Sequence, residues 1–140
     1  LIEVLRCTPI MIQHGIDPEI IDLVSVNPID YETILSSVKK TGRIMVLDTG
    51  TKACGLGSEI ISHVCGNAWE SLISPPVNIG SLNCPCPTST ALSEHYYPTD
   101  ITIITEISKI FKIDIPYNQR KDFHKMHMPS NENIDELLKS

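Results

Sequence analysis

The chain lacks a run of apolar residues long enough to cross a bilayer. Its longest apolar stretches, such as residues 101–104, are interrupted by threonine, whereas a membrane-spanning helix needs roughly 18 or more such residues. Basic charge is also scarce, because 11 Lys and Arg residues stand against 17 Asp and Glu residues and the formal net charge is −6. We therefore expect neither a membrane span nor a surface for nucleic acid or anionic lipid.

The sequence also shows no secretion signal, and its number of cysteines is odd. Residues 1–6 contain an acidic residue and no basic lead, and no Asn-X-Ser/Thr glycosylation sequon occurs. Five cysteines at low density are typical of a protein kept in a reducing compartment. We expect a cytoplasmic location.

A length of 140 residues, with 41% apolar and 20% charged residues, allows one folded domain. Helical periodicity or capping residues predict helices, and short β-branched apolar runs predict strands. The predicted helices are residues 1–13, 30–40, 58–64 and 99–112, and the predicted strands are residues 19–26, 44–47 and 75–80. This alternation predicts an α/β domain over residues 1–113, with helices on both faces of a largely parallel sheet. Residues 114–140 are predicted to form a polar C-terminal tail, with one helical turn at 134–138.

The pattern of reactive residues contains no complete catalytic motif. The Gly55-Leu56-Gly57 loop precedes a helix, but a dinucleotide fingerprint and a phosphate loop each need further residues that are missing. Tight packing of a strand against a helix is the simpler interpretation. Cys84-Pro85-Cys86 has one residue between its thiols instead of the usual two, so half-buried cysteines are favoured over a metal site. Residues 124–128 offer imidazoles and thioethers for copper, but they lie in the predicted tail.

Histidine and serine or cysteine residues show no spacing typical of a catalytic triad. We expect His14, His63 and His95 to be surface or structural residues, and we assign no catalytic, cofactor-binding or metal-binding residue to this chain.

Several segments, in this order and spacing, resemble one known family. The most specific stretch is residues 27–43, and the others are Gly15–Leu23, Gly55–Ile60, Pro76-Val77, Pro85-Cys86-Pro87 and Leu92–Pro98. Together they resemble the C-terminal domain of the transketolase superfamily, and most closely the beta subunit of pyruvate and branched-chain 2-oxoacid dehydrogenases. The resemblance runs from about residue 1 to residue 111 and implies a three-layer α/β/α fold with a mixed, largely parallel sheet. It also leads us to expect that the first strand of the domain is missing from this sequence.

The resemblance further implies a supporting role. In that family thiamine diphosphate and its magnesium ion lie between two other domains, so no cofactor is expected in this domain itself. The implied roles are dimerisation with a second copy or a sister subunit, support of the active site, and docking of an acyltransferase core. The residues expected near the interface are Gly55, Gly57, Glu59, Asn78 and the turn from Pro85 to Pro87. Asp48, Asn78 and Asn83 differ from the residues that are frequent in the family at these positions. The resemblance therefore gives no basis for expecting the family's ion pairs there.

We therefore predict the C-terminal, non-catalytic domain of a thiamine-diphosphate-dependent 2-oxoacid dehydrogenase, inactive as a fragment. The alternatives are the same domain of a transketolase or deoxyxylulose-phosphate-synthase-like enzyme, a stand-alone interaction module, and a small redox or metal protein that uses Cys84 and Cys86.

Overall fold

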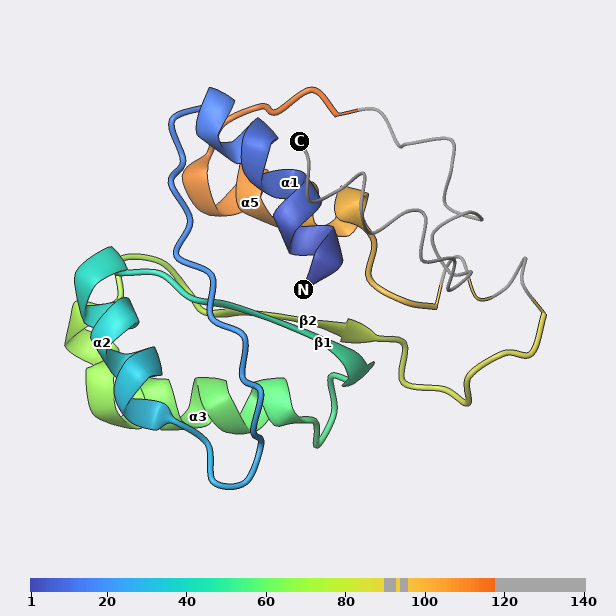
Figure 1. The fold of residues 1–140 in the computed structure, drawn as a ribbon, viewed down its shortest axis with the longest axis horizontal. Helices are drawn as coiled ribbons and strands as arrows, with labels where there is room; N and C mark the ends of the chain where they lie inside the picture. The colour runs from blue at the N-terminus through green and yellow to red at the C-terminus, as the bar shows by residue number, and fades with distance from the viewer. Residues whose placement is uncertain (90–92, 94–95, 118–140) are drawn as a thin grey trace.

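The computed structural model describes residues 1–89, 93 and 96–117 of the chain. In chain order its elements are α1 (Ile2–Gln13), α2 (Tyr31–Thr41), β1 (Met45–Thr51), α3 (Leu56–Ala68), the 3-10 helix η1 (Trp69–Ser71), β2 (Val77–Ser81) and α5 (Asp100–Phe111). They form three layers, with α1 and α5 on one side of the strands and α2 and α3 on the other (Figure 1). The α/β fold class is confirmed.

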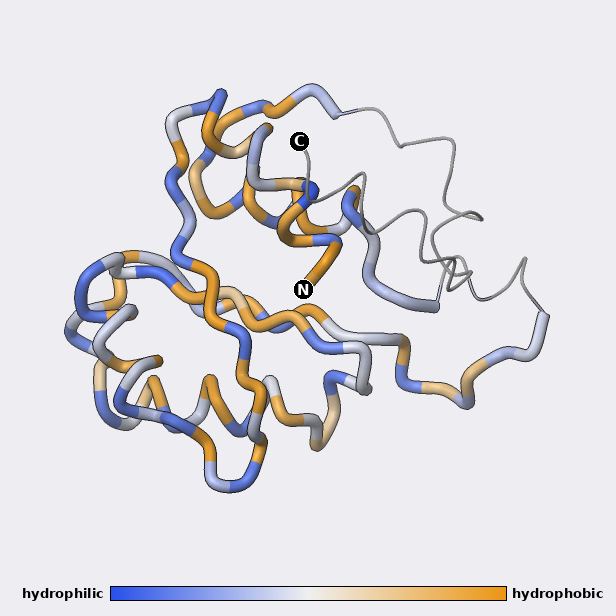
Figure 2. Tube along the Cα trace, viewed as in Figure 1, coloured by the Kyte–Doolittle hydropathy of each residue, from blue (hydrophilic) through white to orange (hydrophobic). Residues whose placement is uncertain are grey.

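The middle layer is a two-stranded parallel sheet, with Met45 paired to Val77 and Leu47 paired to Ile79. Successive side chains of a strand point to opposite faces, so β1 contributes to two cores. Met45 and Leu47 pack against the cluster that α1 and α5 form, whereas Val46 packs against the cluster of α2 and α3. Apolar residues accordingly run along the strands and the helices that cover them (Figure 2).

Capping residues explain where two helices begin and end. The Asp30 carboxylate accepts a hydrogen bond from the Thr33 backbone N–H at 3.0 Å, as predicted for the N-cap of α2. Gly42 ends this helix with a φ of 71°, a left-handed conformation that favours glycine. The helix predicted at 58–64 begins earlier in the structure, at Leu56 with Gly55 as its N-cap, so Ser58 lies within the first turn of α3 instead of capping it. The Ser58 hydroxyl instead donates to the Lys52 carbonyl oxygen at 2.6 Å.

The predicted strand at residues 19–26 is wrong. These residues form an irregular segment that connects α1 to α2 and runs past the strands (Figure 1). A strand exists only where another strand can share its hydrogen bonds, and neither described strand pairs with this segment. The other two strands were predicted correctly, although β1 extends to Thr51 and β2 begins only after Pro75 and Pro76.

The exposed side of α1 also differs from the prediction. Periodicity put Leu1, Val4, Leu5, Met11 and Ile12 near one helical face. Met11 is buried and Val4 packs against the core, as is typical of such a face, but Leu1, Leu5 and Ile12 are each at least half exposed. Pro9 lies inside the helix without ending it.

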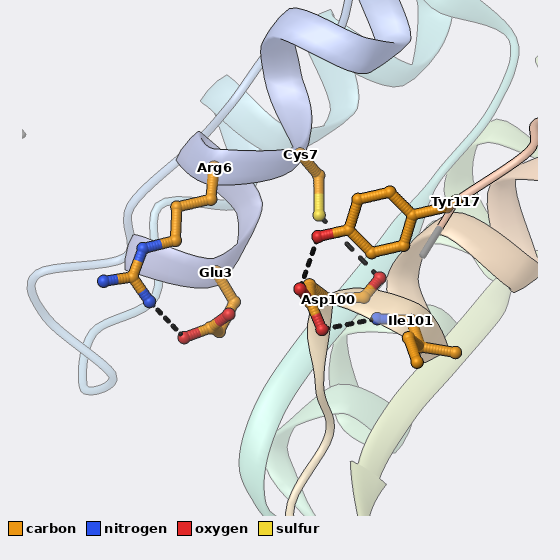
Figure 3. Close-up of polar contacts among 6 residues, drawn as sticks. All are labelled: Glu3, Arg6, Cys7, Asp100, Ile101 and Tyr117. Atoms are coloured by element: carbon orange, nitrogen blue, oxygen red, sulfur yellow. Dashed lines mark hydrogen bonds and ion pairs between the residues drawn. The ribbon is translucent and has the colours of Figure 1, made fainter. Parts of the chain in front are cut away.

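The described part of the predicted tail, residues 114–117, packs against the domain. Ile115 is buried in the cluster of α1 and α5. The Tyr117 hydroxyl donates to the carboxylate of Asp100, a buried residue at the start of α5 (Figure 3). The same carboxylate accepts the Ile101 backbone N–H at 2.8 Å. The helical turn predicted at 134–138 and the His and Met residues of 124–128 lie outside the described residues.

Candidate interface at the start of α3

Four of the predicted interface residues lie close together where α3 begins beside β2. Gly55 is the N-cap of α3, and Gly57 and Glu59 lie at the beginning of that helix. Asn78 is the second residue of β2. The Asn78 side-chain amide donates to the Ser58 hydroxyl at 3.1 Å. Because Ser58 in turn donates to the loop after β1, these bonds connect the loop, the helix and the second strand.

Close approach explains why positions 55 and 57 are glycines. A Cβ atom on Gly55 would lie 2.0 Å from the Thr51 carbonyl oxygen, and one on Gly57 would lie 2.3 Å from the Asn78 Oδ1 atom. Both distances are far below van der Waals contact. The structure therefore supports tight strand-to-helix packing as the role of the Gly55-Leu56-Gly57 loop. The Asn78 Oδ1 atom is buried and has no hydrogen-bond partner among the described residues.

Glu59 belongs to a small cluster that joins α2 to α3. The Tyr31 hydroxyl donates to the Glu59 carboxylate at 3.4 Å, and the Tyr31 ring stacks on the His63 ring with centroids 3.7 Å apart. Desolvation, and then the Glu59 charge, raise the pKa of the Tyr31 phenol. Sequence reasoning missed this cluster. The available signal was the i, i+4 spacing of Glu59 and His63 on one helical face, but nothing in the sequence places Tyr31 beside them.

The proline turn is separate from this group. Pro85 and Pro87 lie in the loop after β2, whose hydrogen bonds lead to residues 96–97. The Tyr96 hydroxyl donates to the Cys84 carbonyl oxygen at 3.1 Å, and the Tyr97 hydroxyl lies 3.3 Å from the Cys86 thiol. The hydrogen bond to Cys86, and then its charge, raise the pKa of Tyr97. No hydrogen bond of the described chain joins this loop to the start of α3. The predicted interface residues therefore fall into two groups: Gly55, Gly57, Glu59 and Asn78 at the start of α3, and Pro85 and Pro87 in the loop after β2.

Within the described ranges, no three His, Cys, Asp or Glu side chains gather in a way that could hold a metal ion. Cys84 and Cys86, which we expected to be half-buried, are exposed free thiols, as is Cys54, whereas Cys65 is half-buried. We assign no catalytic step to these residues.

Several apolar side chains are exposed among the described residues. On α1 about half of each of Leu1, Ile2, Leu5 and Ile12 is exposed, and the other exposed ones are Ile21, Val24, Val26, Trp69, Ile73 and Leu82. Exposed apolar patches are typical of places where proteins associate. None of the helices in the described part of the chain combines the length and apolar character of a membrane span.

Comparisons with known proteins agree on one family. The family described as "Transketolase, C-terminal domain" matches residues 3–103. The chain is 39% identical over 111 residues to "Pyruvate dehydrogenase E1 component subunit beta" of Acholeplasma laidlawii, which covers 79% of this chain and 33% of that protein. It is 34% identical over 101 residues to the mitochondrial subunit beta of Chaetomium thermophilum, covering 72% and 26%, and 33% identical over 91 residues to that of Porphyra purpurea, covering 65% and 28%. The chain thus spans between a quarter and a third of these relatives.

Proposed function

This chain belongs to the transketolase C-terminal domain family, close to the beta subunits of pyruvate dehydrogenase, and from that premise we propose that it serves as the non-catalytic C-terminal domain of a 2-oxoacid dehydrogenase. The observation that carries this proposal is the family match from the first turn of α1 into α5. Relatives named as pyruvate dehydrogenase beta subunits favour a dehydrogenase over a transketolase or a deoxyxylulose-phosphate synthase.

The proposed parent enzyme decarboxylates a 2-oxo acid and transfers the acyl group to a lipoyl carrier. Thiamine diphosphate with magnesium supplies the carbanion stabilisation that this chemistry needs, in the remainder of the parent. The residues of this chain hold the shape of the subunit and provide contacts. The exposed thiols of Cys54, Cys84 and Cys86 suit a reducing compartment, and we propose a cytoplasmic one.

The proposed contacts are of two kinds, one in each helical layer: the polar cluster at the start of α3 and the exposed apolar residues of α1. Protein interfaces commonly have an apolar, aromatic centre and a polar rim. Leu1, Leu5 and Ile12 supply apolar area, while Glu59 and the stacked Tyr31 supply charge and an aromatic ring. The partners are a second copy or the sister subunit of the dehydrogenase, and the acyltransferase core of the complex binds to the assembled subunits.

Charge reversal in the full-length parent protein tests this surface. Glu59→Lys places a cation in the proposed contact, whereas Glu70→Lys makes the same change on η1, at the far end of α3. We expect Glu59→Lys to weaken subunit association about tenfold in analytical ultracentrifugation and Glu70→Lys to leave it unchanged. Equal association of both variants would refute the contact at Glu59.

The gene provides a second test. The DNA upstream of the codon for Leu1 is expected to encode a thiamine-diphosphate-binding region in the same reading frame. A reading frame that encodes only this domain would contradict the dehydrogenase proposal and favour a stand-alone interaction module.

A further inference from the structure

Two of the exposed thiols stand close together in the loop after β2. Cys84 and Cys86 are separated by Pro85 alone, and residues 82–86 are all exposed. The loop runs outward from the sheet (Figure 1). No other two cysteines of the chain are this close in sequence. The supporting role proposed above makes no use of them.

Hydrogen bonds hold this loop in place at Cys84. The Tyr96 hydroxyl donates to the Cys84 carbonyl oxygen at 3.1 Å, and the Leu82 backbone N–H donates to the Tyr96 carbonyl oxygen at 3.3 Å. The Cys84 backbone N–H donates to the Leu82 carbonyl oxygen at 2.9 Å. The rings of Tyr96 and Tyr97 meet edge to face, with centroids 4.8 Å apart. The turn that carries the two thiols is therefore fixed against a pair of packed tyrosines.

The sulfur atom of Cys86 has a polar partner. Its thiol donates to the Pro87 carbonyl oxygen at 3.7 Å, and the sulfur lies 3.3 Å from the Tyr97 hydroxyl oxygen. With the thiol hydrogen directed to Pro87, the Tyr97 hydroxyl is the donor to the sulfur. The raised pKa of the Tyr97 phenol keeps that hydroxyl protonated. The hydroxyl can therefore go on donating when Cys86 reacts as the thiolate, which is the nucleophilic form of cysteine.

The spacing of Cys84 and Cys86 allows a disulfide within the turn. Two residues of chain span at most about 7 Å between Cα atoms when fully extended, and about 6 Å in a polyproline conformation. Disulfides join Cα atoms that are about 4.4 to 6.8 Å apart. Cys54 has no such partner, because Cys65 lies in the last turn of α3, roughly 13 Å along the helix from its start. Cys54 is therefore a matched exposed thiol that cannot close a disulfide with its nearest neighbour in sequence.

We propose that Cys84 and Cys86 form a reversible dithiol–disulfide site, which small-molecule disulfides oxidise and small-molecule thiols reduce. The Cys86 thiolate attacks one sulfur of glutathione disulfide, forms a mixed disulfide and releases one glutathione thiolate. The Cys84 thiolate then attacks the Cys86 sulfur and releases the second glutathione thiolate. The chain gives up two electrons and two protons, and glutathione disulfide is reduced to two thiols. Excess glutathione reverses both steps, as is typical of exposed disulfides in a reducing compartment.

Mass spectrometry tests this inference, which does not depend on the reaction of the parent. The reduced 140-residue chain is treated with glutathione disulfide at neutral pH, quenched with acid and digested with chymotrypsin. Cleavage after Leu82 and Leu92 gives a peptide whose only cysteines are Cys84 and Cys86. We expect this peptide to lose two hydrogens and to carry no glutathione. The Cys54 thiol is the internal control and should retain one glutathione. Excess reduced glutathione should then restore both thiols of the peptide.

Single variants separate the roles of the two thiols. Cys84→Ser should stop at the mixed disulfide on Cys86, and Cys86→Ser should form a mixed disulfide on Cys84 about threefold more slowly. About threefold is what remains of a gain of about tenfold from a hydrogen bond to a thiolate, because a stabilised thiolate is a weaker nucleophile. Tyr97→Phe keeps the ring and removes the hydroxyl. In the Cys84→Ser background it should lower the rate to that of Cys86→Ser.

Four results would overturn the proposal. The peptide with both cysteines could retain glutathione, or stay reduced while Cys54 is modified, and either result would exclude a disulfide within the turn. A disulfide between two chains, seen as a dimer in a non-reducing gel, would assign these thiols to association between copies. A disulfide that withstands excess glutathione would be structural. Equal rates of Cys84→Ser and Cys86→Ser would remove the attacking role from Cys86.

Discussion

Replacing Gly57 by alanine tests the close packing at the start of α3. The new Cβ would lie 2.3 Å from Oδ1, 3.0 Å from Cγ and 3.2 Å from Nδ2 of Asn78, so the whole amide must move. That movement breaks the hydrogen bond from Asn78 to Ser58, worth about 1 kcal/mol, and overpacking adds about 1.5 kcal/mol. The higher helix propensity of alanine offsets up to about 1 kcal/mol of this loss in the free energy of unfolding. We expect Gly57→Ala to lower the free energy of unfolding by about 1.5 kcal/mol, or the midpoint by about 5 °C.

The control is the same substitution in an Asn78→Ala background. Without the amide the clash disappears, and Gly57→Ala should become neutral or stabilising by a few tenths of a kcal/mol, roughly the helix-propensity term reduced in the first turn. Urea unfolding followed by Trp69 fluorescence measures both differences. An equal effect of Gly57→Ala in the two backgrounds, or a stable single variant, would refute the reasoning.

Further predictions concern three other sites. Asp30→Ala should lower the thermal midpoint, whereas Asp30→Asn, which also caps helices, should not. Hydrogen bonds from the Thr33 side chain and backbone hold the pKa of Asp30 below its ordinary value of 3.8, so the advantage of wild type over Asp30→Ala should be complete above that value and fade as the pH falls through the folded-state pKa. Tyr117→Phe leaves the buried Asp100 carboxylate with one acceptor bond fewer and should cost about 2 kcal/mol in urea unfolding. Ile103→Ala, in the cluster of α1 and α5, should cost about 3 kcal/mol by the same assay, and a loss under 1 kcal/mol would contradict its burial.

Local signals predicted most of the fold. Asp30 and Gly42 delimit α2 because capping depends on residues within one helical turn. Four continuous apolar residues placed β1, since both of its faces are covered by helices. Residues 19–26 have an equally good local signal, but strand formation requires a partner at hydrogen-bonding distance, and neither described strand pairs with this segment.

Only part of the candidate site could be predicted from the sequence, because several of its contacts join residues that are far apart along the chain. The glycine positions and Asn78 entered through family resemblance, and the structure adds the contact that explains them. The stacking of Tyr31 on His63 and the packing of Ile115 and Tyr117 join residues far apart in sequence, and no periodicity reports such contacts.

We propose that this domain supports a reaction centre built by other parts of the parent protein. Isothermal titration with thiamine diphosphate and magnesium, on the purified 140-residue chain and on the full-length parent, tests this proposal. We expect saturable binding to the parent and none to the 140-residue chain. Saturable binding to the 140-residue chain would refute the proposal.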